Sequence, residues 1–91
     1  MMLPVAKPDV IYQSLSEGAV LFSASDEVYF GLNEVAARVW EALPATATWD
    51  ELYAAVAAHY PGVDPEKLRS DIHQLIDDLL AQKLLLPPTA D

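Results

Sequence analysis

The chain has 91 residues, 53% of them hydrophobic, so it can bury one modest core and is expected to form one domain. Its 14 acidic and 5 basic residues give a formal net charge of -9. This charge disfavours nucleic acid as a partner, because nucleic-acid-binding surfaces use Lys and Arg to neutralise phosphates. No cysteine is present, which excludes disulfides, thiolate metal sites and a cysteine nucleophile.

The sequence contains no segment typical of an export signal or a membrane span. Its start, MMLPVAKPDV, lacks a charged region followed by a long apolar run. No stretch approaches the roughly 18 apolar residues of a membrane-spanning helix. We therefore expect a cytoplasmic protein, and the lack of cysteine suits a reducing compartment.

Residues 1–8 are expected to form an extended lead-in, 9–86 the folded domain and 87–91 a short tail. Three apolar or alternating runs open the domain, DVIYQSL, AVLFSA and VYFGLN, separated by SEG and SDE. They predict a three-stranded antiparallel meander. The third strand is then an edge, with open hydrogen-bonding groups, unless the first strand curls round to cover it.

Glycine is unexpected in so apolar a third strand. By the two-residue period, Val28, Phe30 and Leu32 share one face of this strand, and Tyr29 and Gly31 share the other. A glycine inside a strand often marks a place where another backbone comes close. Gly31 therefore raises the question of which backbone that is.

Three helices are predicted after the strands, at about 34–43, 49–60 and 65–82, followed by a short closing strand or tail at KLLLPP. Each helix follows a residue suited to capping its N-terminus, and a proline ends each of the first two. In chain order these boundary residues are Asn33, Pro44, Thr48, Pro61 and Asp64. The predicted fold is α+β, with a three-stranded antiparallel N-terminal sheet followed by three helices.

The third helix has an apolar stripe at helical spacing that is suited to the core, formed by Leu68, Ile72, Leu75 and Leu79. Ile76 and Leu80 extend this stripe to one side only, next to Arg69 and His73. The opposite flank carries Asp71, Asp78 and Gln82. Two interpretations stay open: Ile76 and Leu80 pack on a neighbouring element, or they form the wall of a groove.

The sequence offers little to support catalysis. His59 and His73 lie on separate helices, and no spacing suggests a metal site. The neighbouring carboxylates of Asp77 and Asp78 diverge by about 100° on a helix, which is a poor start for an acid–base pair. There is no Gly-rich phosphate loop and no nucleophile elbow. We expect a protein that is not an enzyme and that carries no metal or cofactor.

Strands followed by three helices also fit a winged-helix regulator, whose third helix often enters the DNA major groove. Here that helix has fewer basic than acidic side chains. Lys67, Arg69 and Lys83 stand against a larger number of carboxylates, at Glu66, Asp71, Asp77 and Asp78. A winged-helix DNA-binding regulator is kept as the alternative.

Two stretches carry a resemblance, EGAVLFSASDEVYFGLNEVAARVWEAL and TWDELYAAVAAHYPGVDPEKLRSDIHQLIDDLLAQKLL. Together they are similar to the PqqD-like family over roughly residues 8–86. The most specific element is YFGLN running into AARVW. KLL departs from the family, which commonly has a glycine before two apolar residues at this place.

The resemblance implies a winged-helix-like recognition domain for ribosomally made, modified peptides, as in pyrroloquinoline quinone assembly and lasso-peptide pathways. Such a domain binds the leader of a precursor peptide and delivers it to a radical modifying enzyme or a transglutaminase-like leader protease. The leader adds a strand to the edge of the third strand and lies against the third helix. Free of leader, the same edge can pair two copies into a homodimer.

Carried over by position, the resemblance implies three groups of peptide-binding residues. The edge comes from Val28, Tyr29, Phe30, Gly31 and Leu32. The apolar floor comes from Ile72, Ile76 and Leu80, and a polar rim from Arg69, His73 and Asp77.

Overall fold

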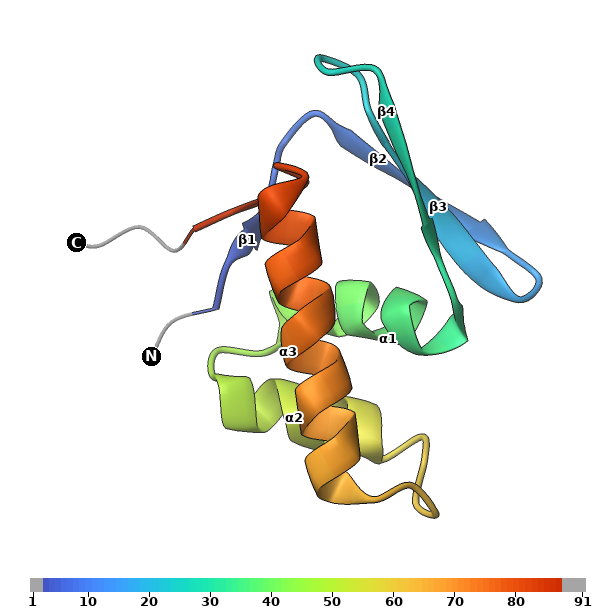
Figure 1. Ribbon diagram of the computed structural model, residues 1–91, viewed down its shortest axis with the longest axis vertical. Helices are drawn as coiled ribbons and strands as arrows, with labels where there is room; N and C mark the ends of the chain where they lie inside the picture. The colour runs from blue at the N-terminus through green and yellow to red at the C-terminus, as the bar shows by residue number, and fades with distance from the viewer. Residues whose placement is uncertain (1–2, 88–91) are drawn as a thin grey trace.

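The structure is a computed structural model that describes residues 3–87, and Figure 1 shows its arrangement. Strands β2 (Val10–Leu15), β3 (Gly18–Ser23) and β4 (Val28–Leu32) form a sheet, and helices α1 (Glu34–Ala42), α2 (Trp49–Ala57) and α3 (Pro65–Ala81) follow. A short 3-10 helix, η1 (Leu43–Ala45), separates α1 from α2. The predicted α+β fold, a three-stranded antiparallel sheet followed by three helices in a winged-helix-like order, is confirmed. Among residues 3–87, none of the helices has the length and apolar character needed to span a bilayer.

The sheet is an antiparallel meander in the order β2-β3-β4, and a turn joins each strand to the next. Leu15 pairs with Gly18 across a short turn, and Ser23 pairs with Val28 across a longer one. Gly18 has a φ of +140°, and a Cβ built there would lie 2.2 Å from the carbonyl oxygen of Leu32. Only glycine fits this position, because a side chain would displace β4 from β3.

Each helix begins at the predicted cap. The side chain of Asn33 accepts from the Ala36 N–H at 2.8 Å, that of Thr48 from Glu51 at 3.1 Å, and that of Asp64 from Glu66 at 3.0 Å. These bonds satisfy amide donors that have no partner within the helix. Helix α2 ends at Ala57, earlier than predicted, because the backbone turns at Ala58 before reaching Pro61.

Helix α3 ends in a reversal built without glycine. Lys83 has a left-handed backbone, with a φ of 61°. Its N–H donates to the Leu80 carbonyl at 3.0 Å, while the Leu84 N–H donates to the Leu79 carbonyl at 2.9 Å. This pattern is a Schellman motif, in which glycine normally takes the left-handed position. Lys83 therefore occupies the place where the resembling family has its glycine.

The reversal creates a strand pair that was not predicted. Strand β5 (Leu85–Leu86) pairs antiparallel with β1 (Val5–Ala6), on the other side of α3 from the main sheet (Figure 1). Leu84 and Leu85 are fully buried, and Leu3 is 7% exposed. Leu3 of the predicted lead-in therefore packs in the core, and Val5–Ala6 joins the fold by pairing with β5. The predicted tail, 87–91, lies outside the described residues apart from its first position.

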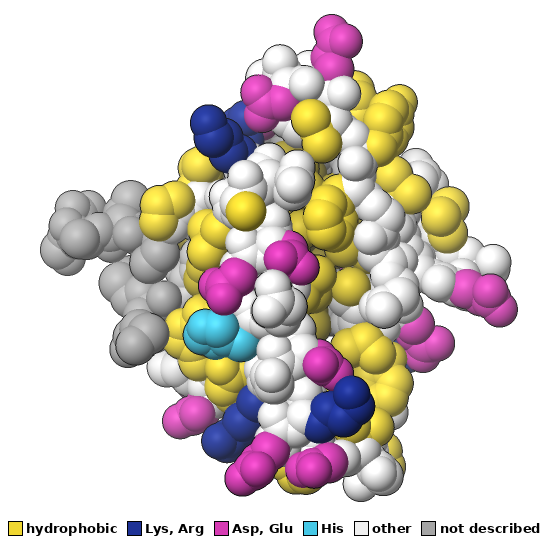
Figure 2. Space-filling view, in the orientation of Figure 1, with side chains coloured by type: hydrophobic (Ala, Val, Ile, Leu, Met, Phe, Trp, Pro, Cys, Tyr) yellow, Lys and Arg dark blue, Asp and Glu magenta, His cyan; other side chains and the backbone are white. Residues whose placement is uncertain are grey.

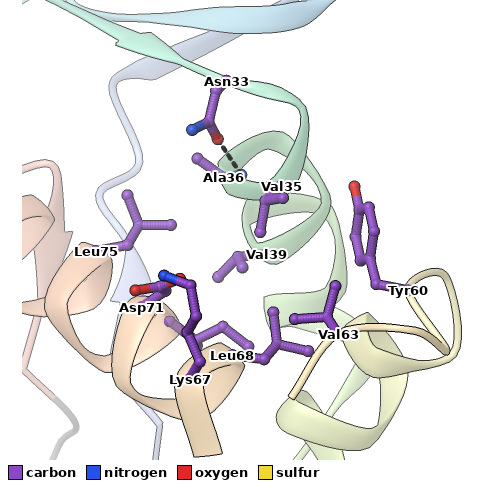
Figure 3. Close-up of a pocket in the computed structure, with 11 residues that line it drawn as sticks. Asn33, Val35, Ala36, Val39, Tyr60, Val63, Lys67, Leu68, Asp71 and Leu75 are labelled. Atoms are coloured by element: carbon purple, nitrogen blue, oxygen red, sulfur yellow. Dashed lines mark hydrogen bonds and ion pairs between the residues drawn. The ribbon is translucent and has the colours of Figure 1, made fainter. Parts of the chain in front are cut away.

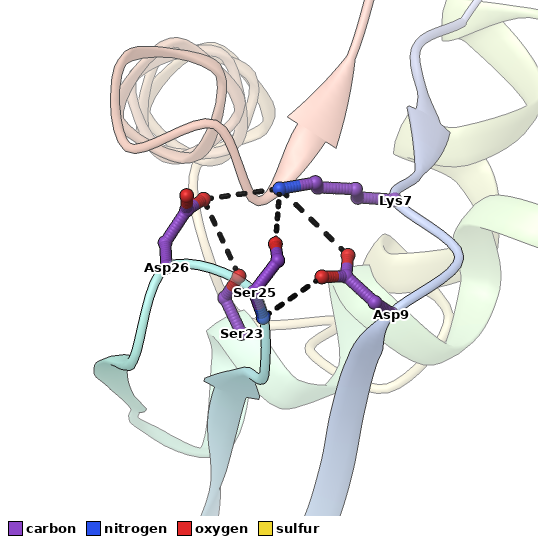
Figure 4. Close-up of polar contacts among 5 residues, drawn as sticks. All are labelled: Lys7, Asp9, Ser23, Ser25 and Asp26. Carbon is purple, nitrogen blue, oxygen red and sulfur yellow. Dashed lines mark hydrogen bonds and ion pairs between the residues drawn. The ribbon is translucent and has the colours of Figure 1, made fainter.

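A polar cluster joins the link between β1 and β2 to the turn between β3 and β4 (Figure 4). The Lys7 ammonium donates to Ser25 Oγ and Asp26 Oδ2, both at 3.0 Å. The Ser25 N–H donates to Asp9 Oδ2 at 3.0 Å, and the buried Ser23 hydroxyl donates to Asp26. The turn before β4 is thereby fixed to the start of the chain.

The cluster shifts two pKa values. The hydrogen bond to Asp26 raises the pKa of Lys7 above 10.5 against the opposing effect of burial. The hydrogen bonds from Ser25, with the nearby Lys7 charge, lower the pKa of Asp9 below 3.8. Both shifts favour the charged forms, which is the state in which the cluster holds together.

Candidate functional site: an open strand edge beside an apolar pocket

Strand β4 has only one strand neighbour within residues 3–87, so one of its long edges is open. Its burial alternates as predicted, with Val28, Phe30 and Leu32 toward the helices and Tyr29 and Gly31 toward solvent. Tyr29 is 73% exposed. The edge predicted from the sequence is confirmed as a feature of the fold.

Two contacts identify the backbone groups that point out of this edge. The Ala24 N–H donates to the Asp9 carbonyl just before β2, so the backbone groups of Ala24 point toward β2. Backbone groups alternate in direction along a strand, so those of the residue before Ala24, and of every second residue from there along β3, point toward β4. The Leu32 carbonyl lies against Gly18 of β3, which shows that the backbone groups of Leu32 also point toward β3. Phe30, in register with Leu21, therefore bonds inward. The N–H and C=O groups of Tyr29 and Gly31 point outward, where a further strand would pair.

An apolar pocket of about 360 Å³ lies at the C-terminal end of β4 (Figure 3). We call it the α1–α3 pocket, because α1, α3 and the segment before α3 form its walls. It is lined by Asn33, Val35, Ala36, Val39, Tyr60, Val63, Lys67, Leu68, Asp71, Ile72 and Leu75. Figure 2 shows hydrophobic side chains exposed in the hollow between α3 and the sheet. A strand that continues past Leu32 along the β4 edge arrives at this pocket.

Polar groups mark the rim of the α1–α3 pocket. Lys67 and Asp71, one helical turn apart, form an ion pair at 3.8 Å. On the opposite wall the Tyr60 hydroxyl accepts from Arg38 Nε at 3.1 Å and lies 3.3 Å from the Glu34 carboxylate. The rim therefore offers hydrogen-bonding groups of both kinds around an apolar interior, an arrangement typical of binding pockets.

The predicted core stripe of α3 is confirmed for Leu68, Ile72 and Leu79, which are buried, but Leu75 and Ile76 exchange the positions expected of them. Ile76, expected in the groove, has no exposed surface, whereas Leu75, expected in the core, is only partly buried and lines the α1–α3 pocket. Ile72 is 1% exposed, although its side chain reaches the base of the pocket. The chain that doubles back at Lys83 forms β5, which contacts α3.

The predicted polar rim lies on the other flank of α3, against α2. The His73 ring stacks on Trp49 with ring centroids 4.9 Å apart, and the Arg69 guanidinium lies 5.3 Å from the Tyr53 ring centre. Asp77 lies 3.9 Å from His73. The structure therefore does not bring Arg69, His73 and Asp77 to the α1–α3 pocket. Leu80 is half-buried, and the helical period puts it on this same flank.

Sequence reasoning missed most residues of the α1–α3 pocket. Val35, Tyr60 and Val63 could not be assigned to a site, because they come from separate segments that only the tertiary fold brings together. Asp71 was expected on the flank of α3 opposite Ile76 and Leu80, and this flank is the one that lines the pocket. The sequence did contain one signal for this site: Leu75 is an apolar residue at the border of the charged flank that carries Asp71 and Lys67.

The described residues provide no arrangement for metal binding. Within residues 3–87, no group of three or more His, Asp or Glu side chains comes close enough to hold an ion. What the site can do chemically is to pair backbone groups along β4 and to bury an apolar side chain nearby.

Comparisons with known proteins identify a family and a similar fold. Residues 18–85 match the family described as coenzyme PQQ synthesis protein D, PqqD. The chain is also similar to the solved structure of TbiB1 in complex with the TbiA(beta) leader peptide, with 26% sequence identity and a TM-score of 0.80. That similarity covers 96% of this chain and 99% of TbiB1. A search of curated proteins found no match.

Proposed function

Because the chain belongs to the PqqD family, we propose that it binds the leader segment of a ribosomally made precursor peptide and presents the peptide to a partner enzyme. The observation that carries the proposal is the open edge of β4 beside the α1–α3 pocket. The structurally similar TbiB1, solved with a leader peptide, supports the choice of ligand.

The leader adds a strand to the β4 edge. Its backbone pairs with the outward groups of Tyr29 and Gly31, which supplies affinity that does not depend on the leader sequence. One apolar leader side chain enters the α1–α3 pocket at the end of β4, which supplies specificity. Within the predicted edge, Val28, Phe30 and Leu32 hold β4 to β3.

On α3, the flank that carries Leu75 forms the wall of the proposed leader site, with Lys67 and Asp71 at the rim of the pocket. Ile72 contributes from the base of the pocket, and Ile76 acts as a core residue behind it. Arg69, His73, Asp77 and Leu80 are not part of the proposed leader site, because they do not line the α1–α3 pocket and lie on the other flank of α3.

The chain acts as a recognition subunit without catalysis of its own, in the cytoplasm, where precursor peptides are made. The partner that receives the leader is a radical modifying enzyme or a transglutaminase-like leader protease. When no leader is present, the open β4 edge pairs two copies of the chain, and leader binding separates them.

A winged-helix DNA-binding role is the less favoured alternative. On α3, Lys67 lies 3.8 Å from the Asp71 carboxylate and Arg69 lies over the Tyr53 ring, so this helix does not present a continuous cationic surface to phosphates. The net charge of -9 also opposes binding to a polyanion.

The test is a pair of fluorescence anisotropy titrations at low salt. One uses a labelled synthetic leader from a candidate precursor peptide, and the other a labelled duplex of promoter DNA. We expect saturable leader binding and no binding to the duplex. Tight duplex binding with a steep salt dependence, without leader binding, would reverse the conclusion.

A further inference from the structure

Gly31 lies on the outer face of the sheet, away from the helices. A Cβ built on Gly31 meets no atom within 4 Å, so nothing in the free protein requires a glycine there. No positive φ requires it either, since among the described glycines only Gly18 has one. The reason for Gly31 must therefore lie outside the free chain, at the edge where another molecule binds.

The surroundings of Gly31 form a small apolar surface that we call the outer shelf, made of Val20, Phe22, Tyr29 and Gly31. Val20 is in register with Gly31, and Phe22 with Tyr29. The Phe22 and Tyr29 rings lie 4.6 Å apart. Because Gly31 has no side chain, the shelf is open from the β4 edge inward to Val20.

A strand added to β4 places one side chain at this opening. Residues level with each other on neighbouring strands project to the same face of a sheet. The leader residue level with Gly31 therefore projects onto the outer shelf, not into the α1–α3 pocket. A large flat side chain there can lean across Gly31 toward Val20 and beside the Tyr29 ring.

We propose that Gly31 is a specificity-determining residue that selects a leader with an aromatic side chain at the position level with it. The inference rests on the proposed function and extends it, because it adds a second contact with the leader, on the outer face of the sheet. It also answers the question raised by the sequence. The glycine makes room for an incoming side chain, whereas the incoming backbone is held by the outward groups of Tyr29 and Gly31.

The test is an in vitro selection of randomised linear peptides for binding to the purified chain. The selection is run in parallel on the parent chain and on the variants Gly31→Val, Gly31→Lys and Ala81→Val. Ala81→Val is the control, because Ala81 is an exposed small residue at the C-terminal end of α3 and is not among the residues that line the α1–α3 pocket.

With the parent chain and with Ala81→Val, we expect enrichment of aromatic residues at one position, in addition to apolar residues at the positions that enter the pocket. Gly31→Val should remove this aromatic preference and weaken a selected peptide by roughly threefold to tenfold. Gly31→Lys should replace the aromatic preference with Asp or Glu at the same position, because opposite charges across neighbouring strands attract. Apolar preferences elsewhere in the peptide should not change.

Two results would overturn the inference in distinguishable ways. If peptides bind and Tyr29→Pro abolishes their binding, but Gly31→Val and Gly31→Lys select the same residues as the parent, then the outer shelf has no role. If no peptide binds, or if binding is insensitive to Tyr29→Pro, then strand addition itself fails, and the inference fails with it.

Discussion

The two edges of the same sheet differ in what surrounds them. At the β2 edge, the Val10 N–H already donates to the Lys7 carbonyl, and the Ser14 carbonyl accepts from the Gln13 side chain. At the β4 edge, no such bond to the outward groups of Tyr29 and Gly31 occurs within residues 3–87. Both edges are strands of similar length, so length does not distinguish them.

The larger difference lies beside the edges. Strand β4 runs toward the α1–α3 pocket, which is apolar. Strand β2 borders a hollow with mostly polar walls, where the Tyr12 hydroxyl donates to Glu41 of α1. Burial and this hydrogen bond raise the pKa of Tyr12 to about 12. An open edge becomes a peptide site when an apolar pocket lies next to it, because backbone pairing alone carries no sequence information.

The largest expected effect separates the wall of the pocket from the core behind it. Ile76→Asp should unfold the domain, because an unpaired charge in a fully buried position is destabilising by several kcal/mol. Leu75→Asp should leave a folded domain that binds leader at least about tenfold more weakly, since its charge stays hydrated in the free pocket. Circular dichroism and anisotropy measure the two outcomes. Equal losses of unfolding free energy in the two variants would contradict the assignment of Leu75 to the pocket wall and Ile76 to the core.

The next effect tests the two edges directly. Tyr29→Pro deletes an outward donor of β4 and should weaken leader binding at least about tenfold while sparing the fold. Ser14→Pro makes the same change at the β2 edge and should leave leader binding unchanged. Tyr29→Ala, which keeps the N–H, separates the donor from the ring. If Ser14→Pro weakens leader binding and Tyr29→Pro does not, the leader binds the β2 edge instead.

Phe30→Pro is the inward counterpart within β4. It removes a bond to β3, so it should lower the free energy of unfolding by at least about 0.5–1.5 kcal/mol, with steric strain added. Thermal or urea unfolding measures this loss. Full stability in Phe30→Pro, with loss in Tyr29→Pro, would mean that the assignment of inward and outward groups is reversed.

A smaller effect concerns the polar cluster that fixes the turn before β4. Asp9 has a lowered pKa, so its stabilisation is present above pH 3.8 and is lost as the pH falls through the folded-state pKa. Lys7 has a raised pKa, so its stabilisation is present below pH 10.5 and is lost as the pH rises through the folded-state value. Neither group changes charge between about pH 5 and 9.

Lys7→Met removes both contributions. The difference in melting temperature between the parent and Lys7→Met should be constant near neutral pH and should shrink at both extremes. A difference that stays the same at acidic pH would show that the cluster does not stabilise the fold through charge. Leader binding at neutral pH should weaken only slightly, because the cluster fixes the turn and none of its residues lines the α1–α3 pocket.

The smallest effect is an increase in stability at the end of α3. Lys83→Gly should raise the free energy of unfolding by roughly 0.5–1 kcal/mol, because glycine adopts the left-handed backbone without a steric penalty. Leader binding should not change, since Lys83 is at the end of α3 away from the α1–α3 pocket. A destabilised Lys83→Gly variant would mean that the Lys83 side chain contributes more than its backbone strain costs.

The sequence predicted the features that depend on neighbouring residues. Asn33, Thr48 and Asp64 cap their helices as expected, because a cap is formed within a few residues of the chain. The alternation in β4 was also predicted, because a strand has a fixed two-residue period. The resemblance to the PqqD family, drawn from the same segments, is confirmed.

The sequence did not predict which flank of α3 is buried. Helical periodicity defines an apolar arc, but Leu75 and Ile76 stand at its two sides, and the neighbouring elements decide which is buried. The reversal at Lys83 brings β5 against α3, and β5 pairs with β1. That pairing joins the two ends of the chain, which no local pattern reports.

The pairing of β1 with β5 has a consequence for how the domain can be attached to other proteins. Val5 is in register with Leu86, so the chain enters and leaves the fold side by side. A linker at either end would tether a fused enzyme from the same place, on the side of α3 away from the main sheet. Fusion in either order would therefore leave the β4 edge accessible, and the linker length would set the effective concentration of enzyme near a captured peptide.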